Sequence, residues 1–252
     1  MSIALSVNLN KLALIRNSRD GNYPNILEFA QLAIENGADG ITLHPRSDGR
    51  HIRPDDVHAI QKLLKNYPNI ELNIEGNPNA HVFGQEHLTM IEFVLELKPH
   101  QFTLVPDNDT QLTSDSGWNV KEHEQNLSQI LGKLKNKGIR SSVFMDADSD
   151  EFSEIALCGA DRVELYTGPY ALGYPTAKKD EVFQSISSAT RKAVQAGMGV
   201  NAGHDLNLDN LSLLATLSEI NEVSIGHALT VDALNMGFVN AIKAYKKLLI
   251  GN

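Results

Sequence analysis

The stretch ENGADGITLH (residues 35–44) carries the pattern that decides the fold. The end of an amphipathic segment reaches Gly37, and a short apolar run then begins at Gly40 and stops at a histidine. The same order of helix end, glycine turn and apolar run recurs at residues 136–144, 157–165 and 195–203. Parallel strands in one sheet need a crossover connection, which is usually a helix. The repetition therefore predicts a chain built from βα units.

Eight apolar runs of this kind predict eight strands, and each run is short. They cover residues 3–8, 40–44, 72–75, 102–106, 141–145, 162–166, 199–203 and 223–226. Stretches with helical periodicity lie between them, at residues 25–38, 55–66, 87–99, 123–138, 148–160 and 189–197. A doubly wound open sheet would give similar signals, but the count of eight and the lack of a glycine-rich dinucleotide turn after the first strand favour a closed (β/α)8 TIM barrel.

Length and composition set the broad class. With 252 residues, 42% of them hydrophobic, and no linker or low-complexity tract, we expect one domain over residues 1–252. The 31 acidic and 22 basic side chains give a net charge of −9, so there is no extended basic field to hold nucleic acid. No leader pattern and no membrane-length apolar run is present, which predicts a cytoplasmic protein. The single Cys158 is interpreted as a packing residue.

Polar side chains stand where the predicted strands end. They are Asn8 and Asn10, His44 and Arg46, Glu75, Glu164, Asn201 and His204, and His227. The active site of a TIM barrel lies at the C-terminal ends of its strands, so these residues are expected to converge. His44 and His204 with Glu75 form an acid–base set, because imidazole exchanges protons near neutral pH. The competing interpretation is that each is a strand-end residue bonded to neighbouring backbone.

Three loops favour anion binding. The run HPRSDGRHIRPDD (residues 44–56) offers guanidinium groups, whose planar fork suits phosphate oxygens, although Arg50 and Arg53 are better interpreted as solvated and paired with nearby aspartates. Residues 201–204 (NAGH) and 224–227 (SIGH) put glycine directly before histidine after the last two strands, which is the customary phosphate site of this fold. The loops at 77–85, interpreted as irregular, and 107–119 are candidate walls of the site.

Metal chemistry is less favoured by the sequence. His44, Glu75 and His204 have the right types to bind Zn²⁺ or Mn²⁺. However, the chain has no closely spaced pair of such ligands at the predicted strand ends. We therefore expect no catalytic metal.

Over essentially its whole length the chain resembles the bacterial pyridoxine 5′-phosphate synthase family. The resemblance is carried by VNLNKLALIRNSRDGNYPN, GADGITLHPRSDGRHIRPDDV, LNIEGNP, KPHQFTLVPD, GVNAGHDLN and VSIGHAL. It implies a TIM-barrel transferase of vitamin B6 biosynthesis that joins 3-amino-2-oxopropyl phosphate to 1-deoxy-D-xylulose 5-phosphate. It also implies that the enzyme needs no metal or organic cofactor, and that it forms a homo-oligomer, most often a homo-octamer.

The resemblance also implies residue roles. The first general base falls on His44, the second on Glu75 and the late general acid on His204. The deoxyxylulose phosphate contacts fall on Arg46, His51 and Thr113, and those of the amino-ketone phosphate on Asn8, Arg19, Asp205, Gly226 and His227. Condensation, dehydration and ring closure are proton transfers between positioned groups, which agrees with these residue types.

The chain departs from the family pattern in four places. Asn10 and Lys11 stand where Asp-His is usual, so their contacts to deoxyxylulose phosphate are in doubt, and Tyr166 and Asp205 replace a frequent histidine and glycine. The segment at 77–85 is also longer than usual.

Glu164 is interpreted as a supporting rather than a catalytic residue. Two alternative hypotheses remain open: a phosphosugar-binding barrel with lost or altered catalysis, and a metal-dependent phosphosugar isomerase or aldolase.

Overall fold

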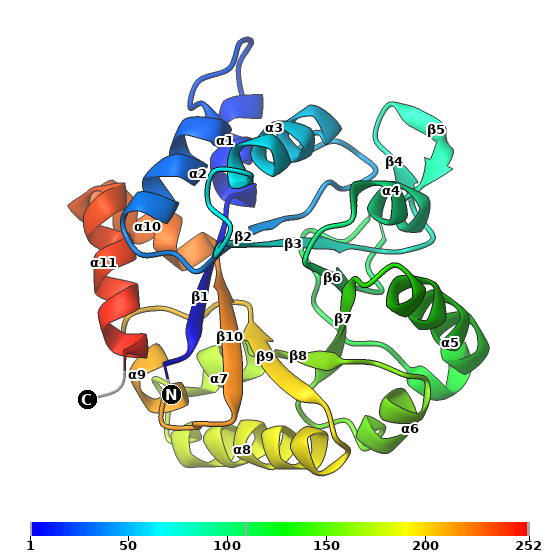
Figure 1. The fold of residues 1–252 in the computed structure, drawn as a ribbon. Helices are drawn as coiled ribbons and strands as arrows, with labels where there is room; N and C mark the ends of the chain where they lie inside the picture. The colour runs from blue at the N-terminus through cyan, green and yellow to red at the C-terminus, as the bar shows by residue number, and fades with distance from the viewer. Residues whose placement is uncertain (1, 109, 251–252) are drawn as a thin grey trace.

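Eight parallel strands close into a barrel in the computed structural model, which describes residues 2–108 and 110–250 (Figure 1). The strands are β1 (Ala4–Asn8), β2 (Gly40–Leu43), β3 (Glu71–Gly76), β6 (Gln101–Leu104), β7 (Arg140–Asp146), β8 (Arg162–Tyr166), β9 (Gly199–Gly203) and β10 (Ile220–Ile225). Their order around the barrel follows the chain, and β1 closes the ring by pairing with β10. The predicted (β/α)8 architecture is confirmed.

Helices surround the barrel (Figure 1). They are α1 (Asn10–Asn17), α2 (Ile26–Glu35), α3 (Pro54–Leu64), α4 (Met90–Leu97), α5 (Val120–Asn136), α6 (Phe152–Leu157), α7 (Gly168–Gly173), α8 (Lys179–Gln195), α9 (Leu211–Leu214), α10 (His227–Met236) and α11 (Phe238–Leu249). The six predicted helical stretches correspond to α2, α3, α4, α5, α6 and α8. No helix in the described ranges is long and apolar enough to cross a membrane.

Local sequence signals set the ends of several helices. Asn25 accepts a hydrogen bond from the Leu27 N–H at the start of α2, and Thr89 and Glu92 form a capping box at the start of α4. The repeated glycine turn also has a physical cause. Gly37 follows α2 with φ of +112°, a backbone conformation that L-residues with a Cβ rarely adopt. The chain can therefore turn straight from helix to strand.

The inside of the barrel is unusually polar. TIM barrels are commonly filled by branched aliphatic side chains. Here the Ser6 and Thr42 hydroxyls lie 2.6 Å apart, the Asn73 amide donates to Thr42, and the Thr103 hydroxyl donates to Asn73 Oδ1 at 3.0 Å. The aliphatic strand residues, such as the fully buried Leu5, belong to the hydrophobic core with apolar residues of the helices. Because these interior groups bond one another, the barrel can carry polar residues up to its mouth.

The interpretation of residues 77–85 as an irregular loop is wrong in part. Residues in and just after it form a small antiparallel hairpin of β4 (His81–Val82) and β5 (Gln85–Thr89), which projects beside α4 (Figure 1). Gly84, with φ of +72°, makes the tight turn between the two strands. The Phe83 ring at the tip lies so close to Gly49 that a Cβ there would overlap it. The hairpin thereby contacts the loop that follows β2.

Candidate active site

A pocket of about 320 Å³ opens at the C-terminal ends of the strands. It contains every residue with a predicted site role except Arg19. Asn201, which was also expected at the mouth, lies outside it: its side-chain oxygen accepts from Arg162 and its amide donates to Gln101. The pocket lining includes Asn8, Asn10, Lys11, His44, Arg46, His51, Glu75, Thr113, Glu164, His204, Asp205, Gly226 and His227. These residues are far apart in the sequence and come together only because the barrel closes. The expected convergence on one mouth is what the structure shows.

Arg19 is the exception. It lies in the stretch after α1 and lines a separate surface hollow with Asn17, Asp20 and Arg53. The neighbouring Asn17 does reach the loop between β2 and α3, because its side-chain amide donates to the His51 carbonyl at 2.7 Å. The structure therefore brings the end of α1 to this loop but does not bring Arg19 into the pocket of its own chain.

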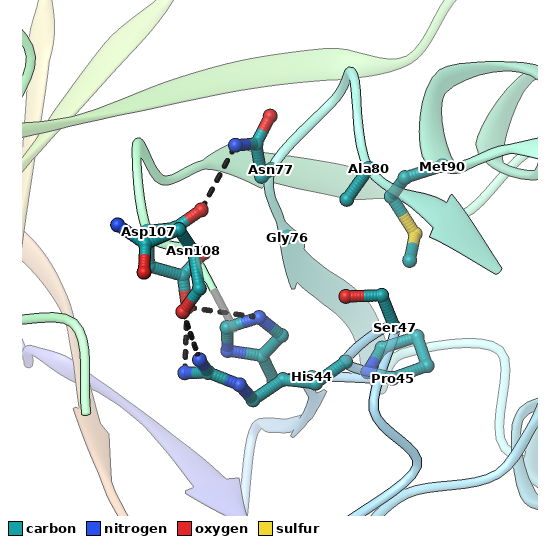
Figure 2. A pocket seen from close by; sticks show the side chains of 10 residues that line it. His44, Pro45, Ser47, Gly76, Asn77, Ala80, Met90, Asp107 and Asn108 are labelled. Atoms are coloured by element: carbon teal, nitrogen blue, oxygen red, sulfur yellow. Dashed lines mark hydrogen bonds and ion pairs between the residues drawn. The ribbon is translucent and has the colours of Figure 1, made fainter. Parts of the chain in front are cut away.

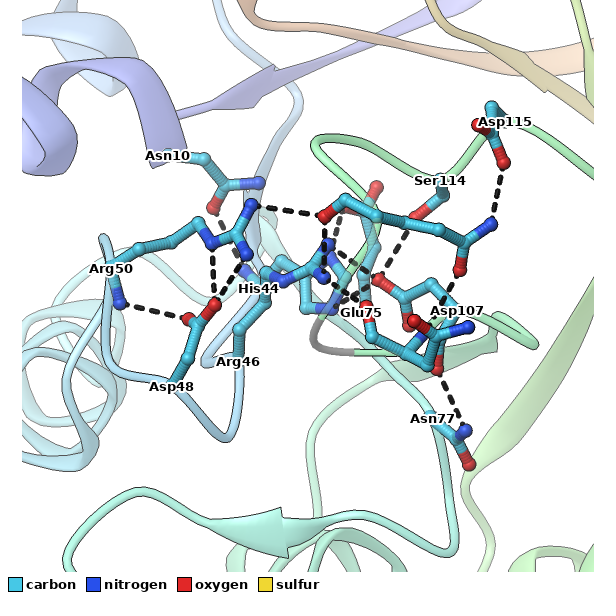
Figure 3. Close-up of polar contacts among 12 residues, drawn as sticks. Asn10, His44, Arg46, Asp48, Arg50, Glu75, Asn77, Asp107, Ser114 and Asp115 are labelled. Carbon is cyan, nitrogen blue, oxygen red and sulfur yellow. Dashed lines mark hydrogen bonds and ion pairs between the residues drawn. The ribbon is translucent and has the colours of Figure 1, made fainter.

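The loop after β2 is tied to the long loop after β6 by arginines (Figure 3). Arg46 Nη1 lies 2.7 Å from Asp107 Oδ2, and its Nη2 donates to the carbonyls of Asn108 and Gln111 at 2.6 and 3.0 Å. Asp107, which pairs with Arg46 and lies 3.6 Å from the His44 ring, was not singled out by sequence reasoning. It directly follows the predicted strand at 102–106, so the strand-end criterion used elsewhere would have found it.

The two outer arginines of this loop behave differently. Arg50 pairs with Asp48 at 2.5 Å, as predicted, but it is not simply solvated: its Nη1 donates to the carbonyls of Gln111 and Leu112, and the residue lines the pocket. Arg53 was expected to form an ion pair with a nearby aspartate, but the Asp56 carboxylate pairs with a different arginine. Asp56 forms its ion pair with the buried Arg16, 2.5 Å away, and accepts only the backbone N–H of Arg53. A buried guanidinium needs a carboxylate more than an exposed one does, which accounts for the difference.

His44 lies between two carboxylates. Its Nδ1 is 3.9 Å from Glu75 Oε2, and its Nε2 is 3.6 Å from Asp107 Oδ2. Its backbone N–H donates to Asn10 Oδ1 at 2.9 Å. Asn10 is thus engaged in fixing the end of β2. The amide keeps an acceptor at this point, as a carboxylate would.

Among residues 2–108 and 110–250, the hydrogen-bond partners of Glu75 are both neutral. Asn8 Nδ2 donates to its Oε2 at 3.2 Å, and Ser224 Oγ lies 3.5 Å from its Oε1. Burial, together with the negative charge of Asp107, raises the pKa of Glu75 to about 7. Glu75 therefore gains and loses a proton near neutral pH.

Both catalytic candidates among the histidines are neutral at pH 7. Burial lowers the pKa of His44 well below its usual range, with His51 and Arg46 adding to the effect. Burial also lowers the pKa of His204 to about 4, although Asp205 opposes the shift. Neutral imidazoles accept protons, and for His204 the negative charge of Asp205 favours the protonated form.

His204 is held by strained backbone and by aromatic rings. His204 and Asp205 have φ of +80° and +56°, which is uncommon for residues other than glycine. The Thr167 hydroxyl donates to the His204 carbonyl at 2.5 Å. The ring packs against Phe144 and, edge to face, against Tyr166, with centroids 5.0 and 5.5 Å away. Strained backbone of this kind gathers at functional sites, where it fixes a side chain.

Glu164 lines the pocket and is almost fully buried. Burial raises its pKa well above the usual range, and within the described chain its Oε2 has no hydrogen-bond partner. Gly203 on β9 makes room for it, because a Cβ there would overlap Glu164 Oε1. No group of three or more His, Cys, Asp or Glu side chains among residues 2–108 and 110–250 is arranged to hold a metal ion.

A closed (β/α)8 barrel with imidazoles, carboxylates and arginines around one pocket at its strand ends defines a TIM-barrel acid–base enzyme. Its family follows from comparison with known proteins. The family model described as pyridoxal phosphate biosynthesis protein PdxJ matches residues 5–251, and the chain belongs to this family. The resemblance seen in the sequence is thereby confirmed.

Two relatives illustrate the match. The chain is 44% identical over 250 residues to pyridoxine 5′-phosphate synthase of Albidiferax ferrireducens, covering 99% of this chain and 98% of the relative. It is 46% identical over 246 residues to that of Bacteroides thetaiotaomicron, covering 97% and 98%. Among solved structures, tryptophan synthase of Mycobacterium tuberculosis is similar with a TM-score of 0.63 at 12% identity, covering 100% of this chain and 94% of that one. That likeness concerns the fold alone.

Proposed function

We propose that this chain is a pyridoxine 5′-phosphate synthase. It condenses 3-amino-2-oxopropyl phosphate with 1-deoxy-D-xylulose 5-phosphate and yields pyridoxine 5′-phosphate, phosphate and water. The observation that carries the proposal is the convergence of thirteen of the fourteen predicted site residues on one pocket, in a chain of this family. The alternative of a phosphosugar barrel with lost or altered catalysis rested on Asn10 and Lys11. The Asn10 amide supports His44, and Lys11 lines the same pocket.

The proton transfers are assigned to three side chains. His44 is the first general base, because a neutral imidazole at the pocket wall can take a proton from substrate. Glu75 is the second, since a carboxyl group with a pKa of about 7 both binds and releases protons at neutral pH. His204 is the late general acid. Substrate phosphate in the pocket adds negative charge, which favours the protonated form that His204 needs for this role.

Two phosphate subsites complete the proposal. Arg46, His51 and Thr113 hold deoxyxylulose phosphate, and Lys11 adds a positive charge to the same wall. The second subsite is formed by Asn8, Asp205 and the start of α10. There Gly226 precedes the helix, and Gly226 lets the backbone come within contact distance of Asn8. Backbone N–H groups at a helix start bind phosphate well. Arg19 joins this subsite only if another copy or a loop movement supplies it.

The direct test incubates purified protein with both phosphates and assays pyridoxine 5′-phosphate and released inorganic phosphate. Formation of both products in equal amounts supports the proposal. Folded protein that binds deoxyxylulose phosphate in a calorimeter without turnover would instead favour a binding barrel. A stoichiometric metal found by elemental analysis, with isomerase or aldolase activity that a chelator removes, would favour the metal-dependent alternative.

Replacing His204 with alanine is expected to lower kcat about a hundredfold or more, because one general acid contributes about 10²–10⁴-fold. Substrate binding stays measurable, since the phosphate subsites do not depend on this ring. Steady-state kinetics with calorimetry of deoxyxylulose phosphate binding check this. A variant with wild-type kcat would remove His204 from the mechanism.

We also propose that the enzyme is a homo-octamer in the cytoplasm. The family resemblance implies the octamer, and charged phosphate esters do not pass an apolar bilayer core unaided. The expected mass in light scattering is eight times the chain mass of 27.7 kDa. A monomeric mass at micromolar concentration, or enzyme recovered outside the cytoplasmic fraction of cells, would contradict this.

A further inference from the structure

We propose that Asp107 is the positioning residue of His44. Its carboxylate accepts the Nε2–H of His44, so that Nδ1 presents its lone pair to the pocket, and it stabilises the imidazolium that forms when His44 takes a proton. This inference rests on the proposed function and adds a residue with no assigned role to the acid–base set. Asp107 acts through His44 and does not touch the substrate.

The position of Asp107 carries the first step of the argument. Asp107 is 5% exposed and borders a cavity of about 10 Å³ together with His44, Asn77 and Met90 (Figure 2). It is not among the residues that line the larger substrate pocket, whereas His44 borders both. Asp107 therefore stands behind the ring, on the side away from the substrate.

The two ring nitrogens of His44 face different acids. Nε2 lies 3.6 Å from Asp107 Oδ2, and Nδ1 lies 3.9 Å from Glu75 Oε2, which lines the pocket. Both distances exceed a hydrogen bond, and catalytic contacts commonly tighten when substrate binds. Which nitrogen carries the proton is set by the bond that the other makes. An acceptor behind Nε2 leaves Nδ1 as the base.

Asp107 is held in place from several directions. Arg46 Nη1 pairs with its Oδ2 at 2.7 Å, and Ser114 Oγ donates to the same oxygen at 3.3 Å. Asn77 Nδ2 donates to its backbone carbonyl at 2.9 Å (Figures 2 and 3). A guanidinium partner favours the ionised carboxylate. A base oriented by such a fixed third group is a recurring arrangement in acid–base enzymes.

The charges around His44 require such an anion. Burial is the main cause that disfavours a positive charge on the ring. His51, Arg46 and Arg50 from its own loop, and His204 directly after β9, add to this effect. The described carboxylates that approach the ring are those of Glu75 on β3 and Asp107 after β6. Glu75 is protonated half of the time at about pH 7. Asp107, paired with Arg46, is the acid that can balance an imidazolium.

The test compares wild type with Asp107→Asn and Asp107→Glu, and uses Asp115→Asn as the matched control from the same loop. Asp107→Asn is expected to lower kcat at least about a hundredfold, the scale on which loss of such an orienting carboxylate acts, with KM changed much less. Asp107→Glu restores part of kcat, and Asp115→Asn stays within about threefold of wild type. A kcat of Asp107→Asn within threefold of wild type would overturn the proposal.

A second readout does not depend on activity. Nitrogen-15 NMR of labelled histidine in the unliganded protein, with His44 assigned by its loss in His44→Gln, reports which nitrogen carries the proton. We expect the Nε2–H form in wild type and a shift toward Nδ1–H in Asp107→Asn. Wild type in the Nδ1–H form would refute the inference even if no variant folds. The expected tautomers without synthase activity would leave the inference standing and refute the proposed function.

Discussion

Replacing His44 with glutamine is expected to lower kcat by about 10²–10⁴-fold, the contribution of a positioned general base. The change removes the basic ring nitrogen but leaves the backbone at position 44 in place. Asn10 Oδ1 accepts the backbone N–H of residue 44, and this bond does not involve the ring. Steady-state kinetics at pH 8 with both phosphates measure the effect. Binding of deoxyxylulose phosphate, measured by calorimetry, is expected to change much less than kcat.

The matched control for this variant is His58→Gln. His58 is exposed on α3, and its ring packs edge to face against Phe93 with centroids 5.5 Å apart. It does not line the pocket, and no role in the reaction is assigned to it. Its kcat is expected to stay within about twofold of wild type, because surface substitutions usually change little. If His44→Gln keeps a tenth or more of wild-type kcat, His44 is not the general base.

Replacing Glu75 with glutamine is expected to abolish measurable turnover and to stabilise the unliganded protein above pH 7. Its folded pKa of about 7 lies above the unfolded value of 4.5. A raised carboxyl pKa contributes stability that is complete below pH 4.5 and is lost as pH rises through 7. Wild type therefore loses on the order of 3 kcal/mol of folding free energy that the glutamine variant keeps.

Urea unfolding at pH 5 and pH 8 checks this prediction. The two proteins are expected to be nearly equal in stability at pH 5, where folded Glu75 is protonated, and the variant to be the more stable at pH 8. The same titration predicts that wild-type kcat/KM falls below pH 7, because the second base is lost there. A stability gap that is the same at both pH values would show that Glu75 does not titrate as proposed.

The strands could be predicted from sequence because their outer faces are apolar and their ends are polar. The predicted run at 72–75 falls inside β3. The run at 223–226 missed the first three residues of β10, where Asn221 and Glu222 make the strand look like a loop. The register shift between Ile220 and Glu222 adds to this irregularity. Apolar patterning therefore located the barrel better than it located strand boundaries.

The site was predictable where one residue type at one strand end was enough, as for His44 and Glu75. It was not predictable where a contact joins two loops. The pairing of Arg46 with Asp107 spans 61 residues and depends on how two loops fold over each other. The separation of Arg19 from the pocket has the same origin, because the path of the chain after α1 has no periodic signal. Contacts of this kind depend on how the closed barrel brings its loops together, which the local sequence does not encode.

The pairing of β1 with β10 also affects how the protein is made. On the ribosome the first strand emerges with one edge that has no partner until residue 225 has been added. At roughly 5–20 residues per second this takes on the order of tens of seconds. Open strand edges attract other chains during that time. The barrel is therefore most exposed to misassembly during synthesis, from the emergence of β1 until β10 has been added near the end of the chain.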